Sequence, residues 1–195
     1  GISAVEEAKY INELEMELIV TDHHLPSDTL PQAVAVIDPH REDCNLEFKD
    51  YAGVGVAYKL ICALEGEENG GTDSFADLVT IGTVADVMPL IKENRELVRR
   101  GVQLIADSDR MGIQSLIEAA GLSERRMTST TVAFGICPRI NAAGRMGSAD
   151  RAIRLLLSED YEEANALAQE INDENATRQQ TEQEILNQAV AQIKN

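Results

Sequence analysis

The sequence predicts an α/β protein with a parallel-sheet core, a helical subdomain and a long helix at its C-terminal end. Two short apolar runs, residues 17–21 and 33–37, have the length expected of strands that are buried in a sheet. Stretches with helical spacing precede and follow these runs, and such close alternation of helix and strand favours a parallel sheet. From Tyr161 onwards, neither glycine nor proline interrupts a regular apolar spacing, which predicts one long helix.

The remaining elements follow from helix and loop signals taken in order. Ser3 is expected to cap a helix that ends near Leu14, with Glu6 completing a capping box. Further helices are predicted at residues 56–64, 75–84, 93–106 and 114–120. The glycine pair in Gly53-Val54-Gly55 lacks the third glycine of a dinucleotide-binding fingerprint and follows no strand. We therefore interpret it as the close approach of a helix N-terminus to another backbone, which would also favour a nearby anion.

Composition excludes several classes of function. With 34 acidic against 17 basic residues, the formal charge is −17, which argues against unspecific binding of the whole chain to nucleic acid or anionic membranes. The balance reverses between Arg139 and Arg154, so that stretch is the candidate for binding phosphate. Nothing approaches the ~20 apolar residues of a membrane span. The three cysteines are widely spaced and are interpreted as free thiols of a reducing compartment, so we expect a soluble, cytoplasmic protein.

Asp22-His23-His24 directly follows the first apolar run and is the strongest candidate for chemistry. In open α/β sheets the active site lies beyond the carboxyl ends of the strands, and all three of these side chains can hold a divalent cation. Imidazole together with carboxylate suits Mn²⁺, Zn²⁺ or Fe²⁺. The alternative is a turn that caps a helix and faces water, because short motifs also match by chance.

Asp86 ends the apolar segment Ile81-Gly82-Thr83-Val84-Ala85 and is the second candidate. A carboxylate in such a place is costly to bury unless it is paired or bound to a metal. Asp86 and His23 on one cation would leave positions open for water and a phosphate oxygen. The alternative is a helix-end acid that reaches solvent. His40, in the loop Asp38-Pro39-His40, is interpreted as a loop residue that could approach this site.

A third candidate is a phosphate clamp made by Arg139 and Arg145, which stand six positions apart with Asn141 between them. The planar fork of arginine donates two parallel hydrogen bonds to a phosphate, and Gly144 is expected to allow tight backbone geometry. The alternative is a pair of arginines that bridge surface acids in a very acidic protein. Cys137 has no histidine beside it in the sequence, so we interpret it as a small buried residue and not as a nucleophile.

Five segments of the chain occur in a characteristic order and spacing. They are Asp22-His23-His24, Asp38-Pro39-His40, Ala52-Gly53-Val54-Gly55-Val56-Ala57, Gly82-Thr83-Val84-Ala85-Asp86-Val87-Met88-Pro89-Leu90 and Pro138-Arg139-Ile140-Asn141-Ala142-Ala143-Gly144-Arg145. Together they resemble the DHH phosphoesterase superfamily and, within it, the branch of single-stranded-DNA-specific exonucleases. The triplet marks the superfamily, whereas the last segment is much more specific to the exonuclease branch. The resemblance covers nearly the whole chain and implies a partial DHH phosphoesterase core.

The resemblance implies a two-metal centre with Mn²⁺ (or Mg²⁺), completed by residues outside this chain. His23 and Asp86 would be metal ligands, with Asp22 supporting the centre as a further metal-binding residue. His24 would contact the scissile phosphate or order the metal-bound water. These four are the implied catalytic residues. Paired metals can generate a hydroxide nucleophile and stabilise charge on the attacking and leaving oxygens.

The same resemblance implies a 5′-to-3′ exonuclease that hydrolyses single-stranded DNA in repair and recombination. Arg139, Asn141 and Arg145 would hold the DNA backbone. Helicases or single-strand-binding proteins are the implied protein partners, and no membrane contact is expected. Two alternatives stay open: a DHH-family phosphodiesterase for oligonucleotides or cyclic dinucleotides, and a non-catalytic DHH scaffold. Retention of the four implied catalytic residues argues against the scaffold.

The resemblance also implies a division into domains. Residues 1–158 would form the DHH domain, and residues 159–195 a connector helix towards a DHH-associated domain that this chain lacks. The family's Asp-rich first motif, and the aspartate of its second motif, are likewise absent from the sequence. The chain begins with Gly1 and not with Met, so we expect it to be part of a longer polypeptide. With only part of the metal site present, the isolated fragment is expected to be inactive.

Overall fold

The computed structural model describes residues 1–66, 74–146 and 149–193, without the side chains of residues 145 and 146. The chain forms two compact units, Gly1–Gly101 and Val102–Asn195. The predicted domain boundary after residue 158 lies inside the second unit and stays a prediction. Among the described residues, no helix has both the length and the hydropathy needed to cross a bilayer.

The first unit holds the sheet that the sequence predicts. α1 (Val5–Glu13) leads into β1 (Ile19–Thr21), which pairs in parallel with β2 (Ala35–Ile37). The register sets Thr21 against Ile37, so both strands end at the same edge. The predicted α/β class and the parallel pairing are therefore confirmed.

The two strands are less buried than predicted. Val20 is 7% exposed whereas Ile19 is 60% exposed, and β2 is half-buried throughout. Alternate side chains of a strand point to opposite faces of the sheet. Within the described residues, β1 buries only the face that carries Val20.

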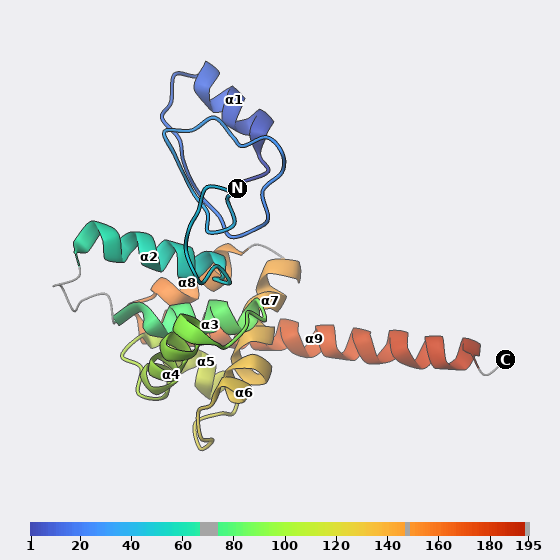
Figure 1. Cartoon of the computed structure of the whole chain (residues 1–195). Coiled ribbons are helices and arrows are strands. Elements are labelled where there is room, and N and C mark those ends of the chain that lie inside the picture. Colours follow the sequence, from blue (N-terminus) through green and yellow to red (C-terminus); the bar gives the residue numbers. More distant parts are fainter. Residues whose placement is uncertain (67–73, 147–148, 194–195) are drawn as a thin grey trace. The chain divides into compact units, whose positions relative to one another are not determined.

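Three helices follow the sheet in the first unit: α2 (Gly53–Glu65), α3 (Ala76–Ala85) and α4 (Lys92–Ala106), whose end passes into the second unit (Figure 1). α2 packs closely on α3, because a Cβ added at Gly82 would lie 2.5 Å from Cγ1 of Val54. The lack of a side chain at this position thus lets the two helices approach each other.

The second unit is helical. Its elements are α5 (Met111–Ala119), α6 (Ser129–Thr131), a π-helix (Val132–Ile136), α7 (Cys137–Met146), α8 (Asp150–Leu157) and α9 (Tyr161–Ile193). The first half of α9 packs on α5, α7 and α8, whereas residues 179–193 are exposed. Figure 1 shows this exposed part of α9 in red. The predicted helical subdomain and long C-terminal helix are confirmed, whereas α6, α7 and α8 lie where no helix was predicted.

The predicted capping box at the start of α1 is wrong. The helix begins at Val5, its N-cap is Ala4, and no side chain bonds to the first turn. Ile2 is 1% exposed, and its N–H donates a hydrogen bond to Asp22. Tertiary packing therefore fixes this segment in place of the local motif that Ser3 suggested.

The π-helix before α7 occupies a stretch for which the sequence predicted no element. Pro138 stands one residue after the start of α7 and has no N–H to donate, so the regular ladder of helical hydrogen bonds is interrupted there. A π turn inside a helix is often found at a functional segment. Here it precedes the segment that carries Arg139 and Asn141.

Candidate metal and phosphate site

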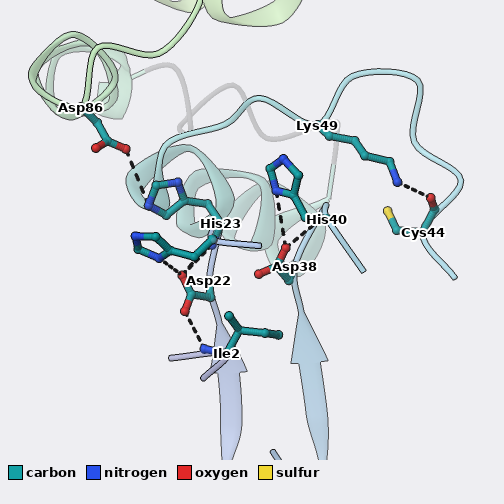
Figure 2. Close-up of polar contacts among 9 residues, drawn as sticks. Ile2, Asp22, His23, Asp38, His40, Cys44, Lys49 and Asp86 are labelled. Atoms are coloured by element: carbon teal, nitrogen blue, oxygen red, sulfur yellow. Dashed lines mark hydrogen bonds and ion pairs between the residues drawn. The ribbon is translucent and has the colours of Figure 1, made fainter. Parts of the chain in front are cut away.

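Asp22 organises the end of β1 by accepting four hydrogen bonds (Figure 2). Its Oδ2 accepts from the backbone N–H of Ile2 at 2.5 Å, and its Oδ1 accepts from the N–H of His23 at 2.7 Å. The same Oδ1 lies 3.2 Å from the backbone N of His24 and 2.7 Å from Nδ1 of its ring. The triplet is thus a turn, as one interpretation of the sequence proposed, but it follows a strand and caps no helix.

The electrostatics of Asp22 favour the ionised carboxylate. Partial burial acts to raise its pKa, but the hydrogen bonds from Ile2, His24 and His23 outweigh burial and hold the pKa of Asp22 well below its usual range. Gly1 permits the close approach of the backbone, because a Cβ there would lie 2.0 Å from Oδ2 of Asp22. Asp22 is therefore an anion at neutral pH that holds the backbone of His23 and the ring of His24.

His23 reaches from β1 to the end of α3. Its Nε2 lies 3.6 Å from Oδ2 of Asp86, and the two side chains are 16% and 46% exposed. This separation is too long for a hydrogen bond. It matches the roughly 3.0–3.6 Å expected between two ligand atoms that each lie about 2.1 Å from a shared cation. The structure therefore brings together the two residues that the sequence proposed for one metal ion.

The turn after α3 holds Asp86 at the helix end. The N–H of Val87 donates to the carbonyl of Val84, and that of Met88 to the carbonyl of Thr83, both at 3.1 Å. Val87 adopts φ 57°, a left-handed conformation that is unfavourable for a β-branched residue. Asp86 is thus half-exposed, as its alternative interpretation proposed, and it also faces His23.

The N-terminus of α2 lies beside the same imidazole. A Cβ added at Gly53 would be 3.4 Å from Cδ2 of His23, an ordinary contact distance. The close approach predicted for this glycine is therefore to a side chain and not to another backbone. The unpaired N–H groups of a helix N-terminus carry partial positive charge, which favours an anion near His23.

The residues of the triplet fit a divalent cation. Asp22, His23 and His24 can each offer one ligand atom, and these atoms lie within 4.8 Å of one another. His24 is the most accessible, with 73% of its side chain exposed, and its ring lies 4.2 Å from that of His23 between centroids. Two imidazoles and carboxylates form the mixed set of ligands that suits Mn²⁺ and related metals.

Asn94 supports this site and was missed by the sequence reasoning. It is 1% exposed, and its Nδ2 donates to the carbonyl of Asp50 at 2.6 Å and to that of Pro89 at 3.1 Å. It thereby ties the turn after Asp86 to the loop before α2. Its only sequence signal is an amide on the otherwise charged first turn of a helix, which does not reveal its partners.

A cavity of about 360 Å³ lies beside β2, and its lining does not include Asp22, His23 or His24. Its lining includes Tyr51 and two cations, Arg41 and Lys59. Arg41 pairs with Asp43 at 2.6 Å, and Lys59 pairs with Glu93 at 2.8 Å. Because both cations already have anionic partners, we do not assign the phosphate site to this cavity.

The proposed phosphate clamp lies in the second unit, on α7. The half-buried Arg139 donates from Nε to Oδ1 of Asn172 at 2.9 Å and from an Nη to the carbonyl of Gly135 at 2.5 Å. Burial lowers the pKa of Arg139. Neither of these partners is an acid, so the contacts differ from the surface ion pair of the alternative interpretation. The bond to Asn172 holds Arg139 to α9.

The other members of the clamp differ in their surroundings. Asn141 is exposed, and Arg145 lies in the last turn of α7 with a side chain outside the described part of the structure. Gly144 does not serve tight geometry as predicted, because a Cβ there would meet no described atom within 4 Å. Cys137 is 3% exposed, which confirms its interpretation as a buried residue.

Comparison with known proteins gives one family. Residues 1–83 match the model of the DHH family, N-terminal domain. The single-stranded-DNA-specific exonuclease RecJ of Bacillus subtilis is 42% identical over 193 residues, which are 99% of this chain and 24% of that protein. RecJ of Escherichia coli is 41% identical over 196 residues, 94% of this chain and 34% of that protein. The chain thus spans about a quarter to a third of the length of these relatives.

Solved structures agree with these relatives. A crystal structure of exonuclease RecJ bound to manganese matches with a TM-score of 0.88 and 41% identity, over 98% of this chain and 49% of that one. RecJ of Thermus thermophilus in complex with Mn²⁺ matches with a TM-score of 0.86 and 40% identity, over 98% of this chain and 29% of that one. The fold described above is therefore that of a part of these enzymes.

Proposed function

We propose that this chain, whose residues 1–83 match the DHH family, N-terminal domain, forms part of the catalytic core of a metal-dependent exonuclease specific for single-stranded DNA. The observation that carries this proposal is the separation of 3.6 Å between Nε2 of His23 and Oδ2 of Asp86 at the carboxyl edge of a parallel sheet. The activity belongs to the whole protein that contains these residues, because this chain spans only part of its relatives. Hydrolysis from the 5′ end, in repair and recombination, follows from the resemblance.

The residues of the triplet have separate roles in this proposal. His23 and Asp86 hold a divalent cation, Mn²⁺ or Mg²⁺, with Asp22 as a supporting ligand. A bound pair of such cations supplies a hydroxide nucleophile and stabilises charge on the phosphate oxygens. Asp22 holds the backbone of His23 and the ring of His24 through its hydrogen bonds, and the exposed His24 contacts the scissile phosphate or orders the attacking water. Further ligands come from residues outside this chain.

Because the chain as a whole is acidic, binding of DNA should depend on local groups that carry positive charge or donate hydrogen bonds. Arg139, Asn141 and Arg145 are proposed to hold the DNA backbone, with Asn141 as the exposed member that contacts phosphate directly. The N-terminus of α2 near His23 adds partial positive charge at the catalytic edge. Helicases and single-strand-binding proteins as partners, and a cytoplasmic location, stay predictions from the resemblance and the composition.

The test uses the whole protein with Mn²⁺ and single-stranded DNA labelled at its 5′ end. We expect release of mononucleotides from that end, with much slower cleavage of duplex DNA. His23→Ala should abolish release, while Asp28→Asn, a change at an exposed acid outside the triplet, should leave it intact.

The other outcomes decide between the alternatives. Cleavage confined to dinucleotides or cyclic dinucleotides would replace this proposal with a phosphodiesterase for small substrates. Binding of single-stranded DNA without any hydrolysis would favour the non-catalytic scaffold. Release that survives His23→Ala would remove the triplet from the mechanism.

A further inference from the structure

Two buried polar atoms at the end of β2 lack hydrogen-bond partners within the described residues. They are Oδ2 of Asp38 and Nδ1 of His40. The side chain of Asp38 is fully buried and that of His40 is 21% exposed. A buried polar atom left unpaired is costly, by an amount comparable to a lost hydrogen bond. These two atoms belong to neighbouring side chains, so one rearrangement can satisfy both.

The backbone holds these two side chains together. Oδ1 of Asp38 accepts from the backbone N–H of His40 at 2.7 Å, which closes a short turn around Pro39. Nδ1 of His40 then lies 3.8 Å from the same Oδ1, about 1 Å beyond hydrogen-bond distance. A small rotation of either side chain would let Nδ1–H donate to the carboxylate. Asp38 is therefore placed to fix the orientation of the His40 ring.

The sheet brings this pair to the catalytic edge. The N–H of Asp22 donates to the carbonyl of Ile37 at 3.0 Å, so Asp38 follows directly beside the triplet. Figure 2 shows the rings of His23 and His40 on the same side, both beyond the ends of the two strand arrows. Nε2 of His40 lies on the side of its ring that faces away from Asp38. A second oriented imidazole thus stands next to the metal-binding residues.

His40 is better suited to a phosphate than to the metal. The cluster of potential ligand atoms within 4.8 Å consists of Asp22, His23 and His24, and His40 is outside it. The cations nearest in sequence are already engaged: Arg41 pairs with Asp43, and Nζ of Lys49 donates to the carbonyl of Cys44 at 2.7 Å. Of the basic side chains in the described residues 36–50, His40 is therefore the one still available to a phosphodiester anion.

We propose that His40 is a substrate-binding residue that donates Nε2–H to a backbone phosphate of single-stranded DNA, with Asp38 as its positioning residue. This inference rests on the proposed function, because it supposes that DNA lies along the edge that carries His23. With Nδ1–H given to Asp38 and Nε2–H given to phosphate, both ring nitrogens act as donors. When Nδ1–H is donated to Oδ2 of Asp38, both unpaired atoms of the pair gain a partner.

The test compares three variants of the whole protein: His40→Gln, His40→Asn and His40→Ala. The amide nitrogen of glutamine can take the place of Nε2, whereas that of asparagine can take only the place of Nδ1. We expect His40→Ala and His40→Asn to raise KM for single-stranded DNA about tenfold or more, as for loss of a hydrogen bond to a charged group. His40→Gln should stay within about threefold of the wild type, and kcat should change less than twofold in all three.

Two direct binding measurements accompany the kinetics. Anisotropy with labelled single-stranded DNA in EDTA should give the same order of Kd values as of KM values. Titration with Mn²⁺ alone should give an unchanged Kd in all three variants. Asp38→Asn keeps an oxygen for the N–H of His40 and should raise KM less than His40→Ala does.

Each other result overturns the inference in a recognisable way. If His40→Asn is tolerated and His40→Gln is not, or if no variant folds, His40 is a structural partner of Asp38. A weaker Mn²⁺ affinity would make His40 a metal ligand. Unchanged KM in all variants of an active enzyme removes this inference alone, whereas a wild type that neither binds nor hydrolyses single-stranded DNA removes the proposed function as well.

Discussion

Nε2 of His23 and Oδ2 of Asp86 lie 3.6 Å apart, although one residue follows a strand and the other ends a helix. The approach depends on the packing of α3 against α2 and on the turn that closes α3. No hydrogen bond joins the two side chains at this distance, so neither satisfies the other. Their separation is that of two atoms that can ligate one shared cation.

Asp86→Asn tests that arrangement. The amide keeps the size of the side chain but loses its charge, so the affinity of the whole protein for Mn²⁺ should fall at least about tenfold, the lower range seen even for outer-shell partners of metal ligands. Calorimetric titration with Mn²⁺ measures this change, and Asp28→Asn is the control for loss of one acid. An unchanged Kd in Asp86→Asn would exclude Asp86 as a ligand.

Gly82→Ala should separate α3 from α2. The new Cβ would lie 2.5 Å from Cγ1 of Val54, and overpacking of this kind costs about 1–3 kcal/mol. Urea unfolding should show a lower free energy of unfolding. Val54→Ala removes the clashing methyl groups, so the double variant should lose less than the sum of the two single changes. Additive losses would show that this contact does not set the distance between the helices.

Asn94→Ala should destabilise the first unit. It removes the amide that donates to the carbonyls of Asp50 and Pro89, and the loss of two hydrogen bonds should cost about 1–3 kcal/mol in total. Asn94→Asp has nearly the same shape but sets a carboxylate against these carbonyls, so it should lower the free energy of unfolding further. The reverse order of the two variants, measured in urea, would mean that side-chain volume matters here more than hydrogen bonding.

The parts of the site that could be predicted from sequence are those with a local signal. The triplet Asp22-His23-His24 follows an apolar run, and Asp86 ends one. The residues next to each of them in the sequence were therefore enough to predict its place at the end of a strand or helix. The parallel pairing of the two strands makes them meet at one edge. Helical spacing likewise predicted α5 and α9 of the second unit, but it did not predict α6, α7 or α8.

The parts that could not be predicted depend on contacts between distant segments. The capping box of Ser3 was overridden because Ile2 is buried and its N–H is used by Asp22. Asn94 gave no local sign of its two carbonyl partners. The pairing of Arg139 with Asn172 depends on the packing of α7 against α9. The spacing of apolar residues within either helix does not predict that packing.

Cys137 should be the least reactive of the three thiols. Burial raises its pKa to about 11, whereas Cys44 and Cys62 are partly exposed. Alkylation with iodoacetamide at neutral pH, followed by peptide mapping, should modify Cys137 only after unfolding. In the unfolded chain this thiol loses its proton near pH 9. The free energy of unfolding should therefore decrease as pH rises from about 9 to about 11, because the folded state keeps the proton longer.

Rapid labelling of Cys137 in the folded protein, at the rate of Cys44, would contradict this burial. Cys137→Ser is the matched variant for the pH dependence. Its free energy of unfolding should be less sensitive to pH between those two values.

Asn141→Ala and Arg139→Ala should separate binding of DNA from stability in the second unit. Asn141 is exposed and makes no hydrogen bond with a described side chain, so its loss should leave the melting temperature unchanged. If it binds a phosphate, the Kd for single-stranded DNA should rise about tenfold, as for one hydrogen bond to a charged group.

Arg139→Ala leaves Asn172 and the carbonyl of Gly135 without their donor, and should lower the free energy of unfolding by about 1–3 kcal/mol. A stable Arg139→Ala protein with weak DNA binding, beside an Asn141→Ala protein with normal binding, would reverse these roles and make Arg139 the contact to DNA.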